Sequence, residues 1–407
     1  MTRVKLAFDD LALFGAPPAF DDLLHVGRPN VGDPQRLHER INTMLANRWL
    51  SNDGPLVREF ERRVAEACGV KHCLAMCNGT IALEIAIRAL DLSGEVILPS
   101  YTFVATAHAL QWQEITPVFC DMDPATHNID PSKIEALITP STTGIIGVHL
   151  WGRGCDTDAI ESIAAKRNLA VLYDAAHAFG CTHQGRRVGG FGRAEVLSFH
   201  ATKFVNSGEG GAVVTNDDAL AEKMRLMRNF GFVHFDKVNH IGTNGKMCEL
   251  SAAMGLTSLD SCGDFVAVNR RNYLHYCEQL RQVRGITPIA YDSAETPNYQ
   301  YVVIEVDEPA AGLSRDELIE LMFAENIRAR RYFWPGAHRM EPYRSYFPNA
   351  HLMLSETERV AAKVIVLPTG TAIGPSDIDA ICAIMRLGLL DPARVRARIK
   401  ERAAAMP

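Results

Sequence analysis

The run Ser198-Phe199-His200-Ala201-Thr202-Lys203, with Gly208-Glu209-Gly210-Gly211 shortly after it, is the most informative part of this chain. Lys203 follows the apolar residues Val196–Phe199, which are typical of a buried strand, and precedes a glycine-rich turn. A desolvated lysine in this place can form a Schiff base with an aldehyde, and the Ser198 hydroxyl can hold a phosphate. Upstream, a second apolar strand ends in the carboxylate of Asp174.

Pyridoxal phosphate (PLP) has three groups that a protein binds, namely an aldehyde, a phosphate and a ring nitrogen that needs an acidic partner. Lys203 can bind the aldehyde, Ser198 the phosphate and Asp174 the ring nitrogen. Taken singly, each residue has a plainer interpretation, because most lysines are exposed and a carboxylate at a strand end can cap a helix or bind a metal. It is the combination that favours the cofactor.

Several other stretches accompany this set, in order from about Trp49 to Leu256. Together they resemble the sugar-nucleotide aminotransferases of the DegT/StrS family, above all those acting on dTDP-4-keto-6-deoxyglucose at C4. The resemblance implies the aspartate-aminotransferase-type fold, which is fold type I of the PLP enzymes. The stretches that carry it, besides residues 198–211, are Trp49–Pro55, Cys77–Leu83, Pro99–Thr106, Tyr173–Gly180 and Gly242–Asn244.

Composition limits the other possibilities. The chain has 407 residues, 47% of them hydrophobic, which is enough for two domains. A net charge of −6 argues against nucleic acid or an anionic membrane as the main partner. We find no apolar run of about 18 residues and no secretory signal, so we expect a cytoplasmic protein without a membrane span.

The cysteines point to no metal site. Ten cysteines are scattered along the chain, and free buried thiols are the expected state in a reducing compartment. The pair His72-Cys73 and the following Cys77 have no second pair of ligands at the spacing of a zinc finger. We therefore expect no bound metal.

The order of apolar segments predicts an α/β fold. Helix-like and strand-like segments alternate from about residue 57, which indicates a mostly parallel central sheet with helices on both faces. Gly211–Thr215 follows the preceding strand too closely for a helical crossover, so we expect it to run antiparallel. The expected helices are 56–68 and 80–90, and the expected strands are 96–98, 118–120, 145–150, 170–173 and 196–199.

Beyond about Asp260 the pattern changes. A long helical stretch, 266–282, leads to an alternating strand, 299–306, and then to a helix with the capping box Ser314-x-x-Glu317. A strand over 327–332 and a last helix from Ser376 complete a smaller α+β unit. We predict a large PLP-binding domain over residues 1–260, which includes the N-terminal segment, and a small C-terminal domain over residues 261–407.

The resemblance assigns roles around the cofactor ring. Lys203 matches the Schiff-base lysine, and Asp174 matches the partner of the protonated pyridine nitrogen. His177 falls where many relatives have glutamine, next to the phenolic oxygen, and histidine there is typical of a subset that includes 4-aminotransferases. A neutral imidazole could donate to that oxygen, although a packed core histidine is the alternative. Phe103 matches the aromatic residue that stacks on the ring, with Tyr101 as its competitor.

The phosphate of the cofactor would lie at a helix N-terminus. Gly79-Thr80 opens a predicted helix, where free N–H groups and the helix dipole attract anions, although such a pair is also an ordinary N-cap. By resemblance, Ser198 and Asn244 complete the phosphate site. In the family this asparagine comes from the neighbouring subunit, which implies a homodimer with shared active sites.

The substrate site is less well defined by the sequence. The basic cluster Arg328, Arg330 and Arg331, with His338 nearby, could meet a diphosphate, since arginine suits phosphate geometry. A solvated strand edge explains these residues equally well. The segment 231–237 could be a loop that reaches the active site of a partner.

The expected function is PLP-dependent transfer of an amino group from L-glutamate to a keto-sugar nucleotide, a dTDP-4-keto-6-deoxyhexose, in amino-sugar biosynthesis. A 3-keto sugar or a cyclitol ketone is an alternative acceptor on the same scaffold. Lys203 disfavours dehydration, because dehydratases of the family carry histidine in its place. A non-catalytic sensor or structural protein is the alternative of a different class. A Rossmann dehydrogenase is disfavoured, because no strand leads into G-x-G-x-x-G.

Overall fold

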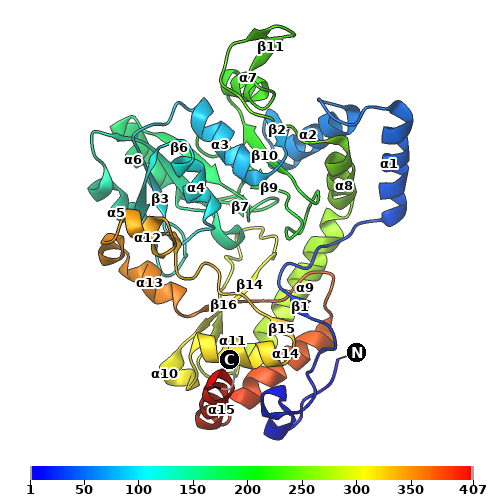
Figure 1. Ribbon diagram of the computed structural model, residues 1–407, viewed down its shortest axis with the longest axis vertical. Coiled ribbons are helices and arrows are strands. Elements are labelled where there is room, and N and C mark those ends of the chain that lie inside the picture. Colours follow the sequence, from blue (N-terminus) through cyan, green and yellow to red (C-terminus); the bar gives the residue numbers. More distant parts are fainter. Residues whose placement is uncertain (1, 405–407) are drawn as a thin grey trace.

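A computed structural model of the chain describes residues 2–404 (Figure 1). Its larger part is built on a seven-stranded sheet with the strand order β2-β10-β9-β6-β5-β3-β4. As predicted, β10 runs antiparallel to both of its neighbours, while the pairs from β9 to β4 are parallel. The strands are β2 (His72–Met76), β3 (Glu95–Pro99), β4 (Thr116–Cys120), β5 (Thr142–Val148), β6 (Ala170–Asp174), β9 (Ala194–Ser198) and β10 (Gly211–Thr215).

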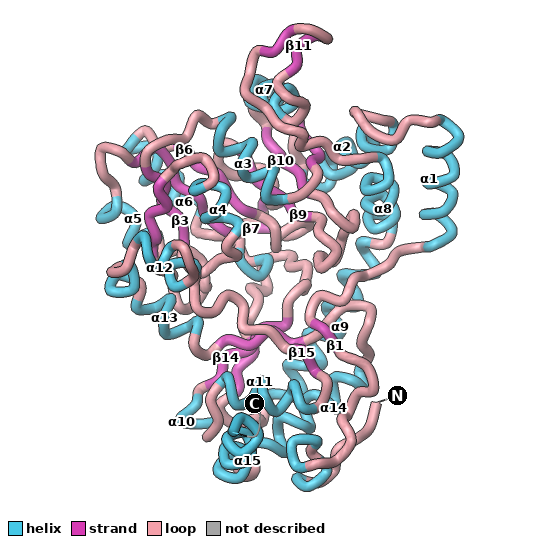
Figure 2. Tube along the Cα trace, viewed as in Figure 1, coloured by secondary structure: helices cyan, strands magenta, loops and turns pink. Residues whose placement is uncertain are grey.

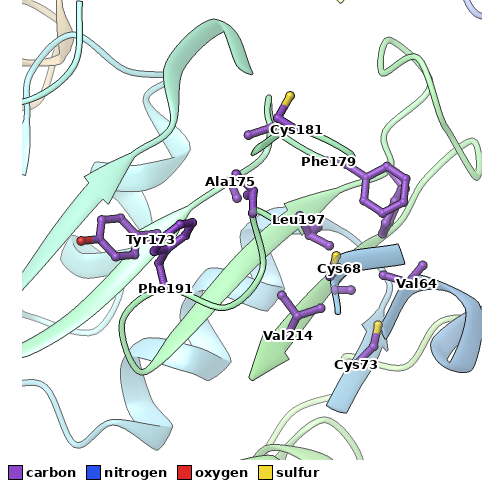
Figure 3. Close-up of a cluster of buried hydrophobic side chains, with 14 of the residues drawn as sticks. Val64, Cys68, Cys73, Tyr173, Ala175, Phe179, Cys181, Phe191, Leu197 and Val214 are labelled. Atoms are coloured by element: carbon purple, nitrogen blue, oxygen red, sulfur yellow. The ribbon is translucent and has the colours of Figure 1, made fainter. Parts of the chain in front are cut away.

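Helices cover both faces of this sheet, as the alternation of segments predicted. Val213 and Val214 are neighbours in β10, yet they belong to separate apolar clusters, because successive side chains of a strand point to opposite faces. Val214 packs with α2 (Pro55–Cys68), α6 (Thr157–Arg167) and α8 (Glu249–Asp260), and Figure 3 shows part of this cluster. Val213 packs with α3 (Gly79–Ala89), α4 (Ala105–Gln111) and α7 (Asp218–Met227).

The C-terminal part is a smaller α+β unit (Figure 2). Its sheet is antiparallel, in the order β13 (Ile286–Pro288), β14 (Val302–Val306) and β16 (Val364–Leu367). The long helix α9 (Cys262–Leu280) leads into it, and α11 (Arg315–Ala324) begins with the predicted capping box of Ser314 and Glu317. The other helices are α10 (Glu308–Ala311), α12 (Tyr343–Tyr346), α13 (Ser355–Ala361), α14 (Pro375–Gly388) and α15 (Pro392–Ala404).

The N-terminal segment packs with the small unit, which differs from our expectation that it belongs with the large one (Figure 1). Strand β1 (Leu24–His25) pairs in parallel with β15 (Ile327–Arg328), and the apolar side chains of residues 11–24 join the small core. The buried carboxylate of Glu325 accepts the backbone N–H groups of Ala12 and Ala19 at 2.6 and 2.7 Å, and Lys5 lies 3.3 Å from it. This ion pair ties the two chain segments together.

Three peripheral features complete the fold. Helix α1 (Pro34–Asn47) lies at the outer edge of the molecule and packs against α8 (Figure 1). The hairpin of β11 (Phe232–His234) and β12 (Lys237–Val238) projects beyond α7, and its tip residue Phe235 is 92% exposed. Short elements α5 (Pro131–Ile134), β7 (Thr182–His183) and β8 (Arg186–Arg187) fill loops.

Two expected strand ends were wrong. Strand β5 stops at Val148, because residues 150–152 form a 3₁₀ turn, and β15 ends at Arg328, after which Arg330 makes only an isolated bridge with Val366. Over residues 2–404, no helix combines the length and the apolar character needed to cross a membrane.

Candidate active site

Seven of the residues singled out from the sequence line one cavity of about 280 Å³. The cavity lies at the carboxyl edge of the parallel strands, where open α/β sheets bind their ligands. The C-terminal part of the chain closes it from the other side with Tyr301, Tyr332 and Phe333. The seven residues are Gly79, Thr80, Phe103, Asp174, His177, Ser198 and Lys203.

Lys203 reaches the cavity from the turn after β9. The turn is held by backbone hydrogen bonds from Phe199 to Gly210 and from Lys203 to His200, each 2.8 Å long. Burial lowers the pKa of the amine from its ordinary value of 10.5 to about 8, and the carboxylate of Asp174 opposes the shift. A large fraction of this amine is therefore neutral near pH 8, which is the state that attacks an aldehyde.

Asp174 ends β6 and is buried. One carboxylate oxygen accepts the hydroxyl of Thr106 at 2.9 Å, and the other accepts the backbone N–H of Ala176 at 3.1 Å. Burial raises the pKa of the carboxyl, while these two donors act against the rise. Within residues 2–404, no cation lies in ion-pair distance of it, so the carboxylate has room for a positively charged partner from the cavity.

His177 is fixed as a neutral hydrogen-bond donor. Its Nδ1 accepts the backbone N–H of Trp151 at 3.4 Å, so the ring proton resides on Nε2. Burial and the nearby Lys203 amine hold the pKa of the imidazole well below its ordinary value. The ring lies between aromatic side chains, with centroid distances of 5.7 Å to Trp151 and 5.8 Å to Phe333. His177 thus packs against aromatic side chains and also lines the cavity.

An anion site forms at the N-terminus of α3. Asn78 caps this helix, accepting the N–H of Ile81 at 2.8 Å, and Gly79 and Thr80 present the first helical turn to the cavity. Ser198 lies beside it: a Cβ on Gly79 would come within 3.4 Å of the serine side chain. At Gly211 a Cβ would lie 2.5 Å from the backbone nitrogen of Gly79, so only glycine lets β10 pass beneath this site.

The structure separates the two aromatic candidates. Phe103 is 59% exposed although it is a large apolar residue, and it lines the cavity. Tyr101 is fully buried and donates its hydroxyl to the carbonyl of Tyr332 at 2.6 Å, outside the cavity wall. Phe103 is therefore the side chain that a flat ligand ring can cover.

Three other expected residues lie outside this cavity. Asn244 is exposed next to β2, where the carbonyl of Gly245 accepts the N–H of Cys77 at 2.8 Å. Arg330 is exposed over the ring of Tyr332, at 5.1 Å from its centroid, and Arg331 pairs with Asp316 at 3.0 Å. None of the three lines the wall of this cavity as residues 2–404 form it.

His338 is placed differently from our expectation of a substrate contact. It is only 2% exposed, and both ring nitrogens are engaged: Nδ1 with the hydroxyl of Ser100 at 2.6 Å and Nε2 with the carboxylate of Glu358 at 2.7 Å. Burial lowers the pKa of this imidazole. Through these two bonds, His338 links the C-terminal part of the chain to the loop of Ser100 and Phe103.

The chain belongs to a family whose model matches residues 33–386, described as the DegT/DnrJ/EryC1/StrS aminotransferase family. It is an enzyme of that family, an aminotransferase.

Similar proteins carry more specific names. The dTDP-4-amino-4,6-dideoxy-D-glucose transaminase of Shigella dysenteriae is 38% identical over 365 residues, which are 89% of this chain and 98% of the relative. The GDP-perosamine synthase of Caulobacter vibrioides is 37% identical over 348 residues, or 83% and 91% of the two chains. The crystal structure of DesI in the presence of its TDP-sugar product aligns with a TM-score of 0.93 and 49% identity, covering 97% of this chain and all of that one.

Membership in this aminotransferase family implies dependence on PLP, and the residues present fit that cofactor. A buried carboxylate with no cation beside it in the described chain suits a protonated ring nitrogen. The Nε2–H of His177 suits the phenolic oxygen, and the helix start at Gly79 with Ser198 suits the phosphate. The amine of Lys203, with its lowered pKa, suits the aldehyde.

The residues that sequence reasoning missed come mainly from the C-terminal part of this aminotransferase. Tyr301, Tyr332 and Phe333 flank short strands and belong to no stretch that resembled the family. Thr106 did lie in such a stretch, yet its contact with Asp174 spans 68 residues of sequence. Only the fold reveals these partners.

The buried amine should cost the protein stability. In cofactor-free protein, Lys203→Met should raise the free energy of unfolding at pH 7 by roughly 1 to 3 kcal/mol, because the native state must bury a charge. Below about pH 8 both states are protonated and the cost is complete; it fades as the pH rises from about 8 toward the ordinary value of 10.5. Denaturant unfolding of both proteins from pH 6 to 10 measures the difference.

Lys166→Met, at an exposed position on α6, is the matched control and should follow the wild-type profile. A constant difference between Lys203→Met and wild type over this pH range would show that the amine carries no buried charge.

Proposed function

We propose that this aminotransferase moves the amino group of L-glutamate to the ketone of a sugar nucleotide, namely a dTDP-4-keto-6-deoxyhexose, with PLP as its cofactor and in amino-sugar biosynthesis. The observation that carries the proposal is the single cavity that holds Lys203, Asp174 and the N-terminus of α3. The name of the Shigella dysenteriae transaminase supports a thymidine diphosphate sugar that is aminated at C4, and the TDP-sugar product of DesI supports the same nucleotide.

PLP, when bound, supplies an electron sink next to the carbon that loses or gains the amino group. The protein would supply the proton transfers and the fixed charges. The amine of Lys203 would take a proton from one carbon and return it to another, so that no proton is consumed. The carboxylate of Asp174, held by Thr106 and Ala176, would keep the ring nitrogen protonated.

We also propose a homodimer with shared active sites. Asn244 is exposed and does not line the cavity of its own chain as described, so a partner subunit could bring it to the phosphate. The hairpin of β11 and β12 projects from the body with Phe235 almost fully exposed, a position suited to contact a second copy (Figure 1).

All ten cysteines are free thiols, which supports a cytoplasmic location.

The cofactor should be fixed on Lys203 by borohydride. Purified protein with added PLP should turn yellow, and after reduction and digestion the label should appear on the peptide that contains Lys203. The Lys203→Ala variant should lose turnover completely. It should still bind the pyridoxamine form of the cofactor, since Asp174 and the anion site remain. A label on another lysine would refute the role given to Lys203.

The regiochemistry can be tested by competition. With glutamate as donor and 4-keto and 3-keto dTDP-6-deoxyhexoses at equal concentration, we expect the 4-keto sugar to be aminated faster, with products assigned by NMR. Preferential amination of the 3-keto sugar would contradict amination at C4 while leaving the assignment as an aminotransferase intact.

Shared sites predict complementation between two inactive proteins. Lys203→Ala and Asn244→Ala, mixed under conditions of subunit exchange, form heterodimers in which one of the two sites is intact. Random mixing should recover about a quarter of the wild-type activity, since half of the dimers are mixed and each has one good site. The control is a mixture of the Lys203→Ala protein with the double variant Lys203→Ala, Asn244→Ala, in which no dimer has an intact site. Recovery no greater than in this control, with exchange confirmed by mass, would contradict shared sites.

A further inference from the structure

The side chain of Lys203 makes one hydrogen bond in the described chain, and its partner is Tyr301. The distance from Nζ to the tyrosine hydroxyl is 3.2 Å. Lys203 belongs to the large unit, whereas Tyr301 directly precedes β14 of the small one. The contact therefore joins the two parts of the molecule at the reactive amine.

Packing holds the tyrosine in place. Tyr301 is 7% exposed, and its ring centroid lies 4.4 Å from that of His177 and 5.3 Å from that of Trp151. Its backbone carbonyl accepts the hydroxyl of Tyr291 at 3.2 Å. A hydroxyl on a ring so constrained has a fixed position, unlike one on a flexible side chain.

A phenol suits a partner that changes its protonation state. The ammonium form of Lys203 can donate to the hydroxyl oxygen, and the neutral amine can accept the hydroxyl proton. Burial raises the pKa of Tyr301, so the phenol stays neutral throughout the working range. A carboxylate in its place would favour only the charged amine.

The other titratable groups that face Lys203 do not offer such a bond. Asp174 is engaged with Thr106 and the backbone of Ala176, and Nδ1 of His177 accepts the backbone N–H of Trp151. Tyr332 lies close enough to affect the pKa of the amine, but the only atom between residues 2 and 404 that hydrogen-bonds Nζ is the Tyr301 hydroxyl.

We propose that Tyr301 is a positioning residue that holds the free amine of Lys203 while it moves protons. The four-carbon lysine chain has several rotatable bonds, so an amine released from the cofactor aldehyde would otherwise sample many orientations. A hydroxyl at a fixed place confines it near the reacting carbon. This inference rests on the proposed role of Lys203 as the lysine that binds the cofactor.

The first test uses cofactor-free protein. Acylation of Lys203 by a small amine-directed reagent, followed by peptide mass at a series of pH values, gives the protonation midpoint of the amine. In Tyr301→Phe the midpoint should fall by about half a unit, because the buried ammonium loses its acceptor, and acylation at pH 7 should become roughly threefold faster. Phenylalanine keeps the ring contacts, so the fold is retained.

The second test uses the PLP-loaded protein. Rapid-mixing absorbance of the glutamate half-reaction should show Tyr301→Phe at least roughly tenfold slower, with the glutamate concentration for half-maximal rate nearly unchanged. A more reactive amine in the first test and a slower proton transfer in the second are opposite effects, which general destabilisation does not produce.

The control is Tyr276→Phe, which removes a buried hydroxyl that donates to the carbonyl of Pro368 at 3.0 Å, away from the cavity. It should leave both measurements unchanged. An unaltered midpoint or an unaltered half-reaction rate in Tyr301→Phe would overturn the positioning role, even if borohydride labelling confirms Lys203. A wild-type label on another lysine would instead overturn the proposed function and this inference with it.

Discussion

The burial of one carboxylate at the end of a parallel strand is the constraint on which the site depends. Asp174 pairs in register with Val148 of β5 and Val196 of β9, so its position is fixed by the centre of the sheet. A carboxylate there requires donors, and Thr106 and Ala176 provide them. The same register places Ser198 and the turn with Lys203 at the same edge. The geometry of the cavity thus follows from the pairing of three strands.

The small unit completes the site from the opposite side. Tyr301, Tyr332 and Phe333 form a wall that lowers the local polarity and desolvates the amine of Lys203. Two polar links also join the small unit to distant segments of the chain. One runs from Ser100 through His338 to Glu358, and the other is the ion pair of Lys5 with Glu325. Both join segments that are far apart in the sequence. The side chains of His338, Lys5 and Glu325 are buried, and that of Glu358 is half-buried.

The sequence predicted what local patterns encode. Apolar runs and helical periodicity located helices α2 and α3 and every strand of the large sheet except β2 to within a few residues, and the antiparallel course of β10 followed from a short connection. Lys203 and Asp174 were recognisable only in combination, because both lie at or just after the end of an apolar strand within stretches that resemble the family. By contrast, the partners of His338, the place of the N-terminal segment and the contact of Tyr301 depend on long-range packing. No periodicity or spacing records such contacts, because they join residues that are far apart in the sequence and meet only in the folded protein.

The buried amine of Lys203 and the buried carboxylate of Asp174 also couple the stability of the fold to what binds in the cavity. Both groups are buried at an energetic disadvantage, and a ligand that bound only the native state at this site would shift the folding equilibrium by mass action. Cells short of vitamin B6 would therefore hold a larger unfolded fraction, which proteases remove. Enzyme abundance would then follow cofactor supply without a dedicated regulator.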